Sequence, residues 1–291
     1  MKLTSPAQVR SLWRDLEFAP SSRLGQNFLI DANILRLILD QAAVGPADTV
    51  LEIGPGFGVL TVELLARARR VVAVEIDARL HEFLRQQHAG NPALELIRAN
   101  ALDLDLQSLV VSKGINKIVA NLPYSSGTRM LMELVQAETL PEDMVLTLQR
   151  EVAERLQAGP GTRDRGLVSV WAQAAYDIRM CKTISATCFV PRPKVASAFV
   201  HLRRQAGVTL RGAEAVAFRR ITRLAFQYRR KQLATIFRMA AEHGEAVVPD
   251  AGAAAALAGI DLQRRPEDLS VLEWRQLARA TAGAEGGGAH G

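Results

Sequence analysis

Cysteine is scarce in this sequence, since Cys181 and Cys188 are the only two among 291 residues. Neither has a histidine or another cysteine at the spacing of a metal-ligand pair. This pattern argues against both a disulfide framework and a zinc site. We therefore expect two buried structural thiols and no metal.

Long hydrophobic runs are missing as well. No stretch of 18 apolar residues occurs, so the sequence predicts no transmembrane helix. Near the N-terminus, Arg10, Arg14 and Asp15 interrupt the apolar positions that a signal peptide would need. We expect a cytoplasmic protein without membrane contact. No internal repeat or heptad pattern is present. Nothing in the sequence suggests an oligomer, so we expect a monomer.

The length and the hydrophobic content of 48% are sufficient for two domains with sizeable cores. A short polar link around Gln205 separates a mixed α/β part from an all-helical part. We predict an α/β domain over residues 1–205, with a mostly parallel sheet flanked by helices. A small helical domain is predicted over 206–291, with a disordered glycine- and alanine-rich tail from about residue 281.

A glycine loop follows the first strong strand pattern. The apolar run 49–53 predicts a strand, Gly54, Gly56 and Gly58 break it, and an apolar helical pattern resumes at Val59. Glycines allow a ligand to approach the backbone closely, and a helix start offers unpaired N–H groups. The pattern predicts a strand, a ligand-binding loop and a helix.

The next strand, which begins at Arg70, ends on Glu75, 19 residues after Gly56. An acid at this place can bind ribose hydroxyls. The loop reads G-x-G-x-G after Glu52, whereas a dinucleotide-binding loop reads G-x-G-x-x-G. S-adenosylmethionine has a ribose and an adenine but no phosphate, so it fits better than a dinucleotide. An ordinary glycine-rich turn is the simpler alternative.

The segment Asn121-Leu122-Pro123-Tyr124 follows another predicted strand, 117–120. An adenine amine is a weak nucleophile, and a site that methylates it needs hydrogen-bond acceptors and a ring for stacking. Asn121 supplies a side-chain carbonyl, while Pro123 biases Leu122 towards an extended conformation and can direct a backbone carbonyl to the same amine. Tyr124 can stack on the base. A simple turn that closes the strand is the alternative.

Positive charge is concentrated in one region. Between Arg203 and Arg238 there are ten basic residues and one acid, Glu214, a net charge of +9 that leaves −3 for the rest of the chain. We predict one helix through 218–237, with an apolar face and a basic face. The predicted RNA-binding residues are Arg219, Arg220, Arg223, Arg229, Arg230 and Lys231. A solvated basic face is the alternative.

Five motifs in this order resemble those of the rRNA adenine N6-dimethyltransferases of the KsgA/RsmA type, from about Leu24 to Leu277. The motifs are Gly25-Gln26-Asn27-Phe28-Leu29, the loop 52–58, Glu75, Asn121 to Tyr124, and Phe189-Val190-Pro191-Arg192-Pro193-Lys194-Val195 with Ser197. Segment 226–231 resembles the basic helix of the family's C-terminal domain. The resemblance implies a Rossmann-like, S-adenosylmethionine-dependent methyltransferase domain followed by a small helical domain.

The same resemblance implies dimethylation of two adjacent adenosines in a hairpin loop near the 3′ end of small-subunit (16S) rRNA, during maturation of the small ribosomal subunit. The implied cofactor-binding residues are Gln26, Asn27, Leu29, Glu52, Gly54, Gly56, Glu75, Asn100 and Asn121. The implied catalytic residues are Asn121, Pro123 through its carbonyl, and Tyr124 and Phe189 as the two sides of a sandwich around the base.

At position 100 the family usually has an acid that accepts from the cofactor's adenine amine, whereas this chain has Asn100. An amide can still accept a hydrogen bond, but without charge. Three other functions remain open: a large-subunit (23S) rRNA adenine methyltransferase of the macrolide-resistance type, an assembly factor that acts by binding, and a nicotinamide-dependent oxidoreductase. The last explains neither Asn121 to Tyr124 nor the basic segment.

Overall fold

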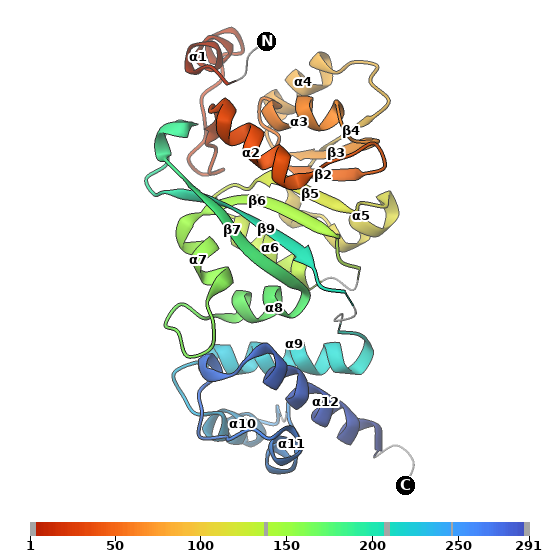
Figure 1. The fold of residues 1–291 in the computed structure, drawn as a ribbon, viewed down its shortest axis with the longest axis vertical. Helices are drawn as coiled ribbons and strands as arrows, with labels where there is room; N and C mark the ends of the chain where they lie inside the picture. Colours follow the sequence, from red (N-terminus) through yellow and green to blue (C-terminus); the bar gives the residue numbers. More distant parts are fainter. Residues whose placement is uncertain (1–3, 137–138, 207–209, 246, 288–291) are drawn as a thin grey trace. The chain divides into compact units, whose positions relative to one another are not determined.

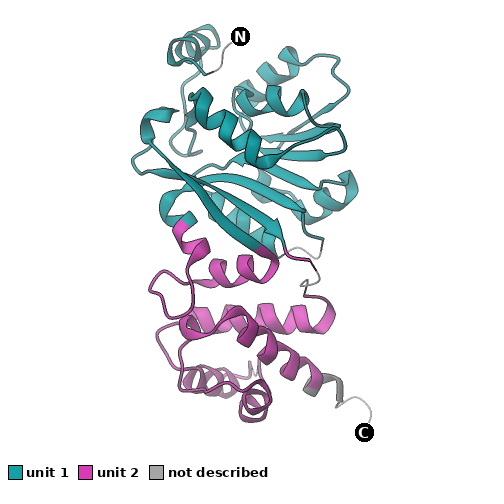
Figure 2. Ribbon diagram, in the orientation of Figure 1, with its two compact units in different colours: residues 1–153, 177–204 teal, residues 154–176, 205–291 magenta. Residues whose placement is uncertain are grey.

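The computed structural model describes residues 4–136, 139–206, 210–245 and 247–287. These residues form two compact units, shown in Figure 2. Unit 1 comprises the described residues up to 153 together with 177–204, and unit 2 comprises 154–176 and the described residues from 205 onward. This division differs from the predicted one, 1–205 and 206–291, in placing 154–176 with the helical unit. The domain boundaries at 1–205 and 206–291 stay a prediction.

Unit 1 contains a seven-stranded sheet in the order β4-β3-β2-β5-β6-β9-β7 (Figure 1). A separate two-stranded sheet consists of β1 and β8. Strands β2 to β6 are parallel neighbours, and β9 is antiparallel to β6. The strands are β1 (Phe28–Leu29), β2 (Thr49–Ile53), β3 (Arg70–Glu75), β4 (Leu94–Arg98), β5 (Lys117–Asn121), β6 (Asp143–Gln149), β7 (Tyr176–Ile184), β8 (Phe189–Val190) and β9 (Ser197–Arg204). The predicted α/β class with a mostly parallel sheet is confirmed.

Helices precede and separate the strands, and those that follow β2 to β5 connect parallel strands of the sheet. They are α1 (Pro6–Asp15), α2 (Ala32–Ala42), α3 (Val59–Leu65), α4 (Ala78–Gln87), α5 (Leu106–Lys113), α6 (Gly127–Val135) and α7 (Arg150–Gln157), with short 3₁₀ turns η1 (Ala101–Asp103) and η2 (Ala186–Cys188). None of the helices in the described part of the chain combines the length and the hydrophobicity needed to span a bilayer.

The strand register brings four sequence positions to one edge of the sheet. Ile53 pairs with Val74, and Glu75 pairs with Arg98, so the loop after β2, the end of β3 and the loop after β4 are neighbours. Strand β5 lies on the other side of β2 and ends at Asn121. In open α/β sheets, ligands bind at the carboxyl ends of the strands. The fold therefore gathers the glycine loop, Glu75, Asn100 and Asn121.

One face of the sheet is covered by α2 and α3. Ile34, Ile38 and Leu39 of α2 pack in a single buried cluster with residues from β2, β3, β5, β6 and β9. Asp31 caps the N-terminus of this helix, and its carboxylate accepts from the N–H groups of residues 33 and 34. Burial of side chains of this size stabilises the fold by about 1.5–3 kcal/mol each. The packing of α2 and α3 therefore holds in place the strands whose ends form the pocket.

The pairing of β1 with β8 attaches segment 25–29 to residues 189 and 190. Phe28 lies opposite Val190, and Leu29 lies opposite Phe189. The Phe28 ring also makes edge contacts with Trp13, Phe18 and Phe57. Because Phe57 belongs to the glycine loop, the aromatic cluster joins the N-terminal helix α1, segment 25–29 and this loop. Edge-to-face aromatic pairs of this kind each contribute about 0.5–1.5 kcal/mol beyond area burial.

Unit 2 is helical, with α8 (Leu167–Ala175), α9 (Gly212–Gln227), α10 (Leu233–Glu242), α11 (Ala251–Ala258), η3 (Pro266–Asp268) and α12 (Val271–Gly287). The single helix predicted through 218–237 is wrong, because α9 ends at Gln227 and α10 begins at Leu233. The first N–H groups of α10, those of Leu233 and Ala234, donate to the carbonyls of Arg264 and Leu262. These long-range bonds hold the start of α10 away from a continuation of α9.

The expected loss of structure from about residue 281 is also corrected in part. Helix α12 continues to Gly287, and Thr281 is buried, with its hydroxyl donating to the Leu277 carbonyl. Alanine favours a helix, and the burial of Thr281 shows that α12 packs against the rest of the protein at this residue. The composition of this segment did not predict such packing. Residues 288–291 lie outside the described residues.

Candidate active site

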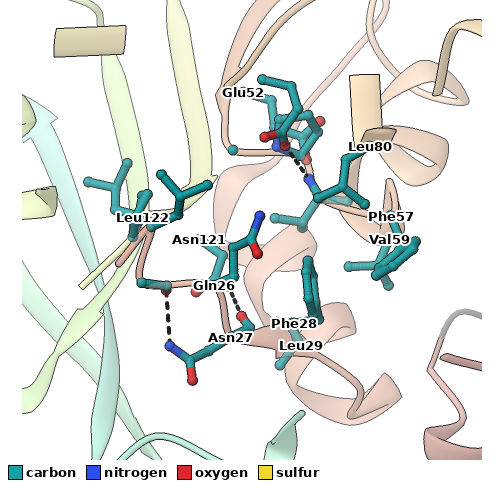
Figure 3. A pocket seen from close by; sticks show the side chains of 18 of the residues that line it. Gln26, Asn27, Phe28, Leu29, Glu52, Phe57, Val59, Leu80, Asn121 and Leu122 are labelled. Carbon is teal, nitrogen blue, oxygen red and sulfur yellow. Dashed lines mark hydrogen bonds between the residues drawn. The ribbon is translucent and has the colours of Figure 1, made fainter. Parts of the chain in front are cut away.

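A pocket lies at the carboxyl edge of the sheet in unit 1. Segment 24–29, the loop around Gly54 and Gly56, the end of β3 and the turn 121–124 all contribute to its wall (Figure 3). Ten of the predicted cofactor-binding and catalytic residues line this pocket: Gln26, Asn27, Leu29, Glu52, Gly54, Gly56, Glu75, Asn121, Pro123 and Tyr124.

Two glycines are required by close packing around the pocket. Gly56 has φ +60°, and a Cβ there would lie 2.9 Å from the Phe28 ring. Gly25 has φ +66°, and its Cβ would lie 3.0–3.1 Å from Ser125 Oγ and from the backbone nitrogens of Tyr124 and Ser125. Both conformations favour glycine. Segment 25–29 is thus pressed against both the glycine loop and the turn after β5.

Glu75 is buried, and its carboxylate holds the backbone of the glycine loop by a hydrogen bond. Its two carboxylate oxygens accept from the backbone N–H groups of Gly56 at 3.0 Å and Asp77 at 2.9 Å. Burial raises the pKa of Glu75 to about 7, against the lowering effect of these bonds. Each carboxylate oxygen keeps a second lone pair, so Glu75 can still accept hydrogen bonds from a ligand.

Glu52 lies beside Glu75 and is fully buried. Burial raises the pKa of Glu52 to about 8; the hydrogen bond from the Thr61 hydroxyl, at 2.7 Å, lowers it, and the charge of Glu75 raises it further. At neutral pH the Glu52 carboxyl is therefore largely protonated and can itself donate a hydrogen bond. Perturbed carboxyl groups in a pocket are typical of functional sites.

Asn121 has a fixed amide orientation. Its Nδ2 donates to the Asn27 carbonyl at 2.9 Å, and Asn27 Nδ2 in turn donates to the Gly25 carbonyl at 3.0 Å (Figure 3). Asn121 Oδ1 is buried and accepts no hydrogen bond from the described residues. An unpaired buried acceptor costs about 1–3 kcal/mol, and Asn121 is one of the residues that line the pocket.

The carbonyl predicted to assist Asn121 has other partners. The Pro123 carbonyl accepts from the N–H groups of Gly127 at 2.7 Å and Ser126 at 3.2 Å, so both of its lone pairs are used by the start of α6. The carbonyl of Leu122, which also lines the pocket, accepts no hydrogen bond from any described residue. Proline at 123 holds Leu122 extended, and the available acceptor is therefore one residue earlier than predicted.

Tyr124 and Phe189 are in different environments. Tyr124 lines the pocket, and its hydroxyl hydrogen-bonds the hydroxyl of Ser197, a fully buried residue of β9. Burial raises the pKa of the Tyr124 phenol, while the bond to Ser197 lowers it. Phe189 is fully buried in the core cluster with Leu29, and its ring is not part of the pocket wall. Strand alternation in β8 turns Phe189 inward, so the structure does not bring the predicted sandwich together.

A second hollow adjoins the first and contains Asn100. The two share Leu24, Gly54, Ile76 and Pro123. Asn100 Oδ1 accepts from the Leu102 N–H at 3.2 Å, and its Nδ2 donates to Asp103 Oδ2 at 3.1 Å. Because Glu75 pairs with Arg98, the loop that contains Asn100 lies next to the end of β3, at the same edge of the sheet.

The sequence did not indicate several apolar residues of the pocket wall. Val9 of α1 is almost fully buried and lines it, as do Phe57 and Leu80. Val9 belongs to an apolar stripe with Leu12 and Trp13 at helical spacing, and this stripe is the signal that could have marked α1 as a packed helix. Nothing in that spacing says which pocket the helix covers.

The predicted RNA-binding residues of unit 2 differ in their contacts. Arg220 donates to the Val247 carbonyl, Arg223 stacks on Trp171, and Arg229 contacts Glu267 and the Arg163 carbonyl. Arg219 is half-buried. By contrast, Arg230 and Lys231 are exposed in the turn after α9, and their side chains have no ion pair or hydrogen bond within the described part of the chain. These two cations are the most available for an external phosphate.

Comparison with known proteins gives a family match over most of the chain. The profile of the family described as ribosomal RNA adenine dimethylase matches residues 18–279. The chain is 36% identical to the ribosomal RNA small subunit methyltransferase A of Clostridium perfringens, over 94% of each chain. It is 40% identical to the protein of the same name from Opitutus terrae, over 95% of this chain and 98% of that one.

Two solved structures share the fold. A dimethyladenosine transferase from Plasmodium falciparum superposes with a TM-score of 0.71 at 24% identity, covering 86% of this chain and 95% of that one. The 23S rRNA methyltransferase ErmE superposes with a TM-score of 0.61 at 27% identity, covering 88% and 99%.

Proposed function

Since this chain belongs to the ribosomal RNA adenine dimethylase family, we propose that it transfers methyl groups from S-adenosylmethionine to N6 of two adjacent adenosines near the 3′ end of small-subunit rRNA. Each adenosine receives two methyl groups. The observation that carries this proposal is the buried, unpaired Asn121 Oδ1 at the edge of a pocket that also contains Glu75.

The pocket suits the cofactor on physical grounds. The close glycine loop leaves room for a ligand beside the backbone, and Glu75 has free lone pairs for two ribose hydroxyls. The adjoining hollow has apolar walls from Ile53, Val74 and Met130, which suit a flat base. S-adenosylmethionine, when bound, supplies the electrophilic methyl group. Gln26, Asn27, Leu29, Glu52 and Gly54 would surround its amino-acid part.

The residues around Asn121 would hold the target adenine. Asn121 Oδ1 and the Leu122 carbonyl are the two free acceptors, and the N6 amine has two N–H groups to donate. These bonds would orient the nitrogen lone pair towards the methyl group, and the released proton can pass to solvent. Tyr124 would stack on the base. Alignment and directed hydrogen bonds supply the rate enhancement, without a strong general base.

The relatives favour a small-subunit substrate. Curated proteins at 36–40% identity over nearly their whole length carry the name small subunit methyltransferase A, whereas the large-subunit enzyme is only 27% identical. We further propose that the protein acts as a monomer in the cytoplasm. Transfer of labelled methyl groups to isolated small subunits lacking adenine methylation, with large subunits in parallel, tests the substrate. Label on large-subunit rRNA alone would reject the proposal.

Cofactor binding should weaken in acid. The ribose hydroxyls donate to an ionised Glu75, whose pKa in the free protein is about 7. Above pH 7 the Glu75 carboxyl is already ionised. Below pH 7 it must lose a proton before it can accept hydrogen bonds from the ribose hydroxyls. We expect the Kd of S-adenosylhomocysteine to rise by up to about tenfold per pH unit below 7, measured by calorimetry between pH 5.5 and 8.5. A flat profile across this range would contradict the assignment.

Ser197 should act by positioning Tyr124. Ser197→Ala leaves the partly buried Tyr124 hydroxyl without its partner, so we expect kcat to fall about fivefold while the affinity for S-adenosylhomocysteine is unchanged. The double variant with Tyr124→Phe should be no slower than Tyr124→Phe alone, because the hydroxyl is then absent. Additive losses would show that Ser197 acts elsewhere. Ser185→Ala, at an exposed serine of the same region, serves as a control.

Arg230 and Lys231 should contact rRNA phosphates. Changing both to glutamine is expected to weaken binding to small subunits and to flatten the plot of log Kd against log salt by roughly 0.7–0.9 for each lost contact. Filter binding at several salt concentrations measures both quantities. Arg238→Gln is the control, since Arg238 is exposed but pairs with Glu242. An unchanged salt dependence in the double variant would exclude these residues from the interface.

A further inference from the structure

The side-chain amide of Asn100 accepts one hydrogen bond and donates another. Its Oδ1 accepts from the Leu102 N–H at 3.2 Å, and its Nδ2 donates to the Asp103 carboxylate at 3.1 Å. An amide keeps its shape when it is turned by 180°, but its donor and acceptor exchange places. In the turned state the amide N–H would face the Leu102 N–H and the amide oxygen would face a carboxylate. Both contacts would be repulsive, so Leu102 and Asp103 fix one orientation.

This orientation matters because Asn100 lies in the hollow next to Glu75. The two positions are adjacent in the sheet, since the N–H of Ala99 donates to the Glu75 carbonyl at 3.1 Å. A nucleoside whose ribose is bound by Glu75 would extend its base between Ile53, Val74 and Met130, with Asn100 at the edge of the ring. Asn100 Oδ1 keeps a second lone pair there.

We infer that Asp103 is a positioning residue that makes this subsite select a 6-aminopurine over a 6-oxopurine. With the amide oxygen held towards the base, Asn100 accepts from an exocyclic amine, because the N–H that a 6-oxopurine would need is given to the Asp103 carboxylate. A carboxylate at position 100 would make this choice alone, because it only accepts. An asparagine can hydrogen-bond either base, and Asp103, together with the Leu102 N–H, removes this ambiguity. The inference rests on the proposed function, because it assumes that the nucleoside is the cofactor's.

The test compares two ligands that differ only at this atom. The Kd values of S-adenosylhomocysteine and S-inosylhomocysteine are measured by calorimetry with the full chain. The wild type should prefer the adenosyl ligand, and Asp103→Ala should reduce the ratio of the two Kd values by about fivefold, the equivalent of one ordinary hydrogen bond. Adding Asn100→Asp to Asp103→Ala should restore the preference, since position 100 then only accepts.

Asp105→Ala is the matched control. Asp105 lies on the same loop and carries the same charge, but it caps α5 through Ser108 and does not contact Asn100. Its variant should leave the ratio unchanged. A ratio within twofold of wild type in Asp103→Ala, or an equal loss in Asp105→Ala, would overturn the inference while leaving the proposed function intact. Failure of the wild type to bind S-adenosylhomocysteine would overturn both.

Discussion

Replacing Asn121 by alanine is expected to lower the kcat of methyl transfer roughly 100- to 1,000-fold, the usual loss when a directed hydrogen-bonding group is removed from a transition state. Asn121 Oδ1 is buried and unpaired, and the Asn27 carbonyl holds the amide so that this oxygen stays available. Single-turnover methylation of small subunits, at saturating cofactor, measures the effect directly.

The affinity for S-adenosylhomocysteine separates this role from a structural one. Because Asn121 also anchors segment 25–29, a modest loss of affinity, up to about fivefold for one hydrogen bond, is expected. Asn121→Asp keeps a side-chain acceptor for the target amine, so it should retain more activity than the alanine variant. Because it cannot donate to the Asn27 carbonyl, it should remain less active than the wild type. If Asn121→Ala methylates within tenfold of wild type, the target amine is not bound at this residue.

Replacing Glu75 by glutamine is expected to raise the Kd of S-adenosylhomocysteine roughly 100-fold. Hydrogen bonds to a charged acceptor contribute about 1.5–3 kcal/mol each, and two ribose hydroxyls would lose their charged partner. The amide also cannot accept from both Gly56 N–H and Asp77 N–H as the carboxylate does. The glycine loop should therefore loosen as the ligand contact weakens. Calorimetry with the purified variant gives the change in Kd.

Glu63→Gln is the control for this experiment. Glu63 lies on α3, is partly exposed and pairs with Arg67, so its variant should bind the ligand as the wild type does. The thermal unfolding of both variants shows whether a change in fold accounts for the result. A Glu75→Gln protein that is folded and binds within threefold of wild type would contradict the ribose assignment.

Much of unit 1 follows from local sequence patterns. The glycine loop, the strand ending on Glu75 and the turn after β5 were predicted at the residues where they occur, because short buried strands and glycine turns are local features. Their convergence follows from the parallel register, which places strand ends at one edge. The pairing of β1 with β8 and the packing of Val9 into the pocket wall depend on distant contacts, which a single sequence does not reveal.

The errors have specific physical causes. Phe189 was predicted to contact the base, but the alternation of β8 places its ring in the core. The Pro123 carbonyl was predicted as an acceptor, but the first N–H groups of α6 occupy it. The long basic helix is interrupted because carbonyls of residues 262 and 264 bind the start of α10. Each outcome is decided by a hydrogen-bond partner or a packing face that local sequence does not specify.

We propose that the pocket around Asn121 dimethylates adjacent adenosines of small-subunit rRNA. The most direct test of this proposal incubates the protein and S-adenosylmethionine with small subunits that lack adenine methylation, then locates and counts the methyl groups by mass spectrometry of nuclease fragments. We predict two methyl groups on each of two neighbouring adenosines near the 3′ end, and far fewer with Asn121→Ala after the same incubation time. Methyl groups elsewhere on the rRNA, or none despite cofactor binding, would contradict the account.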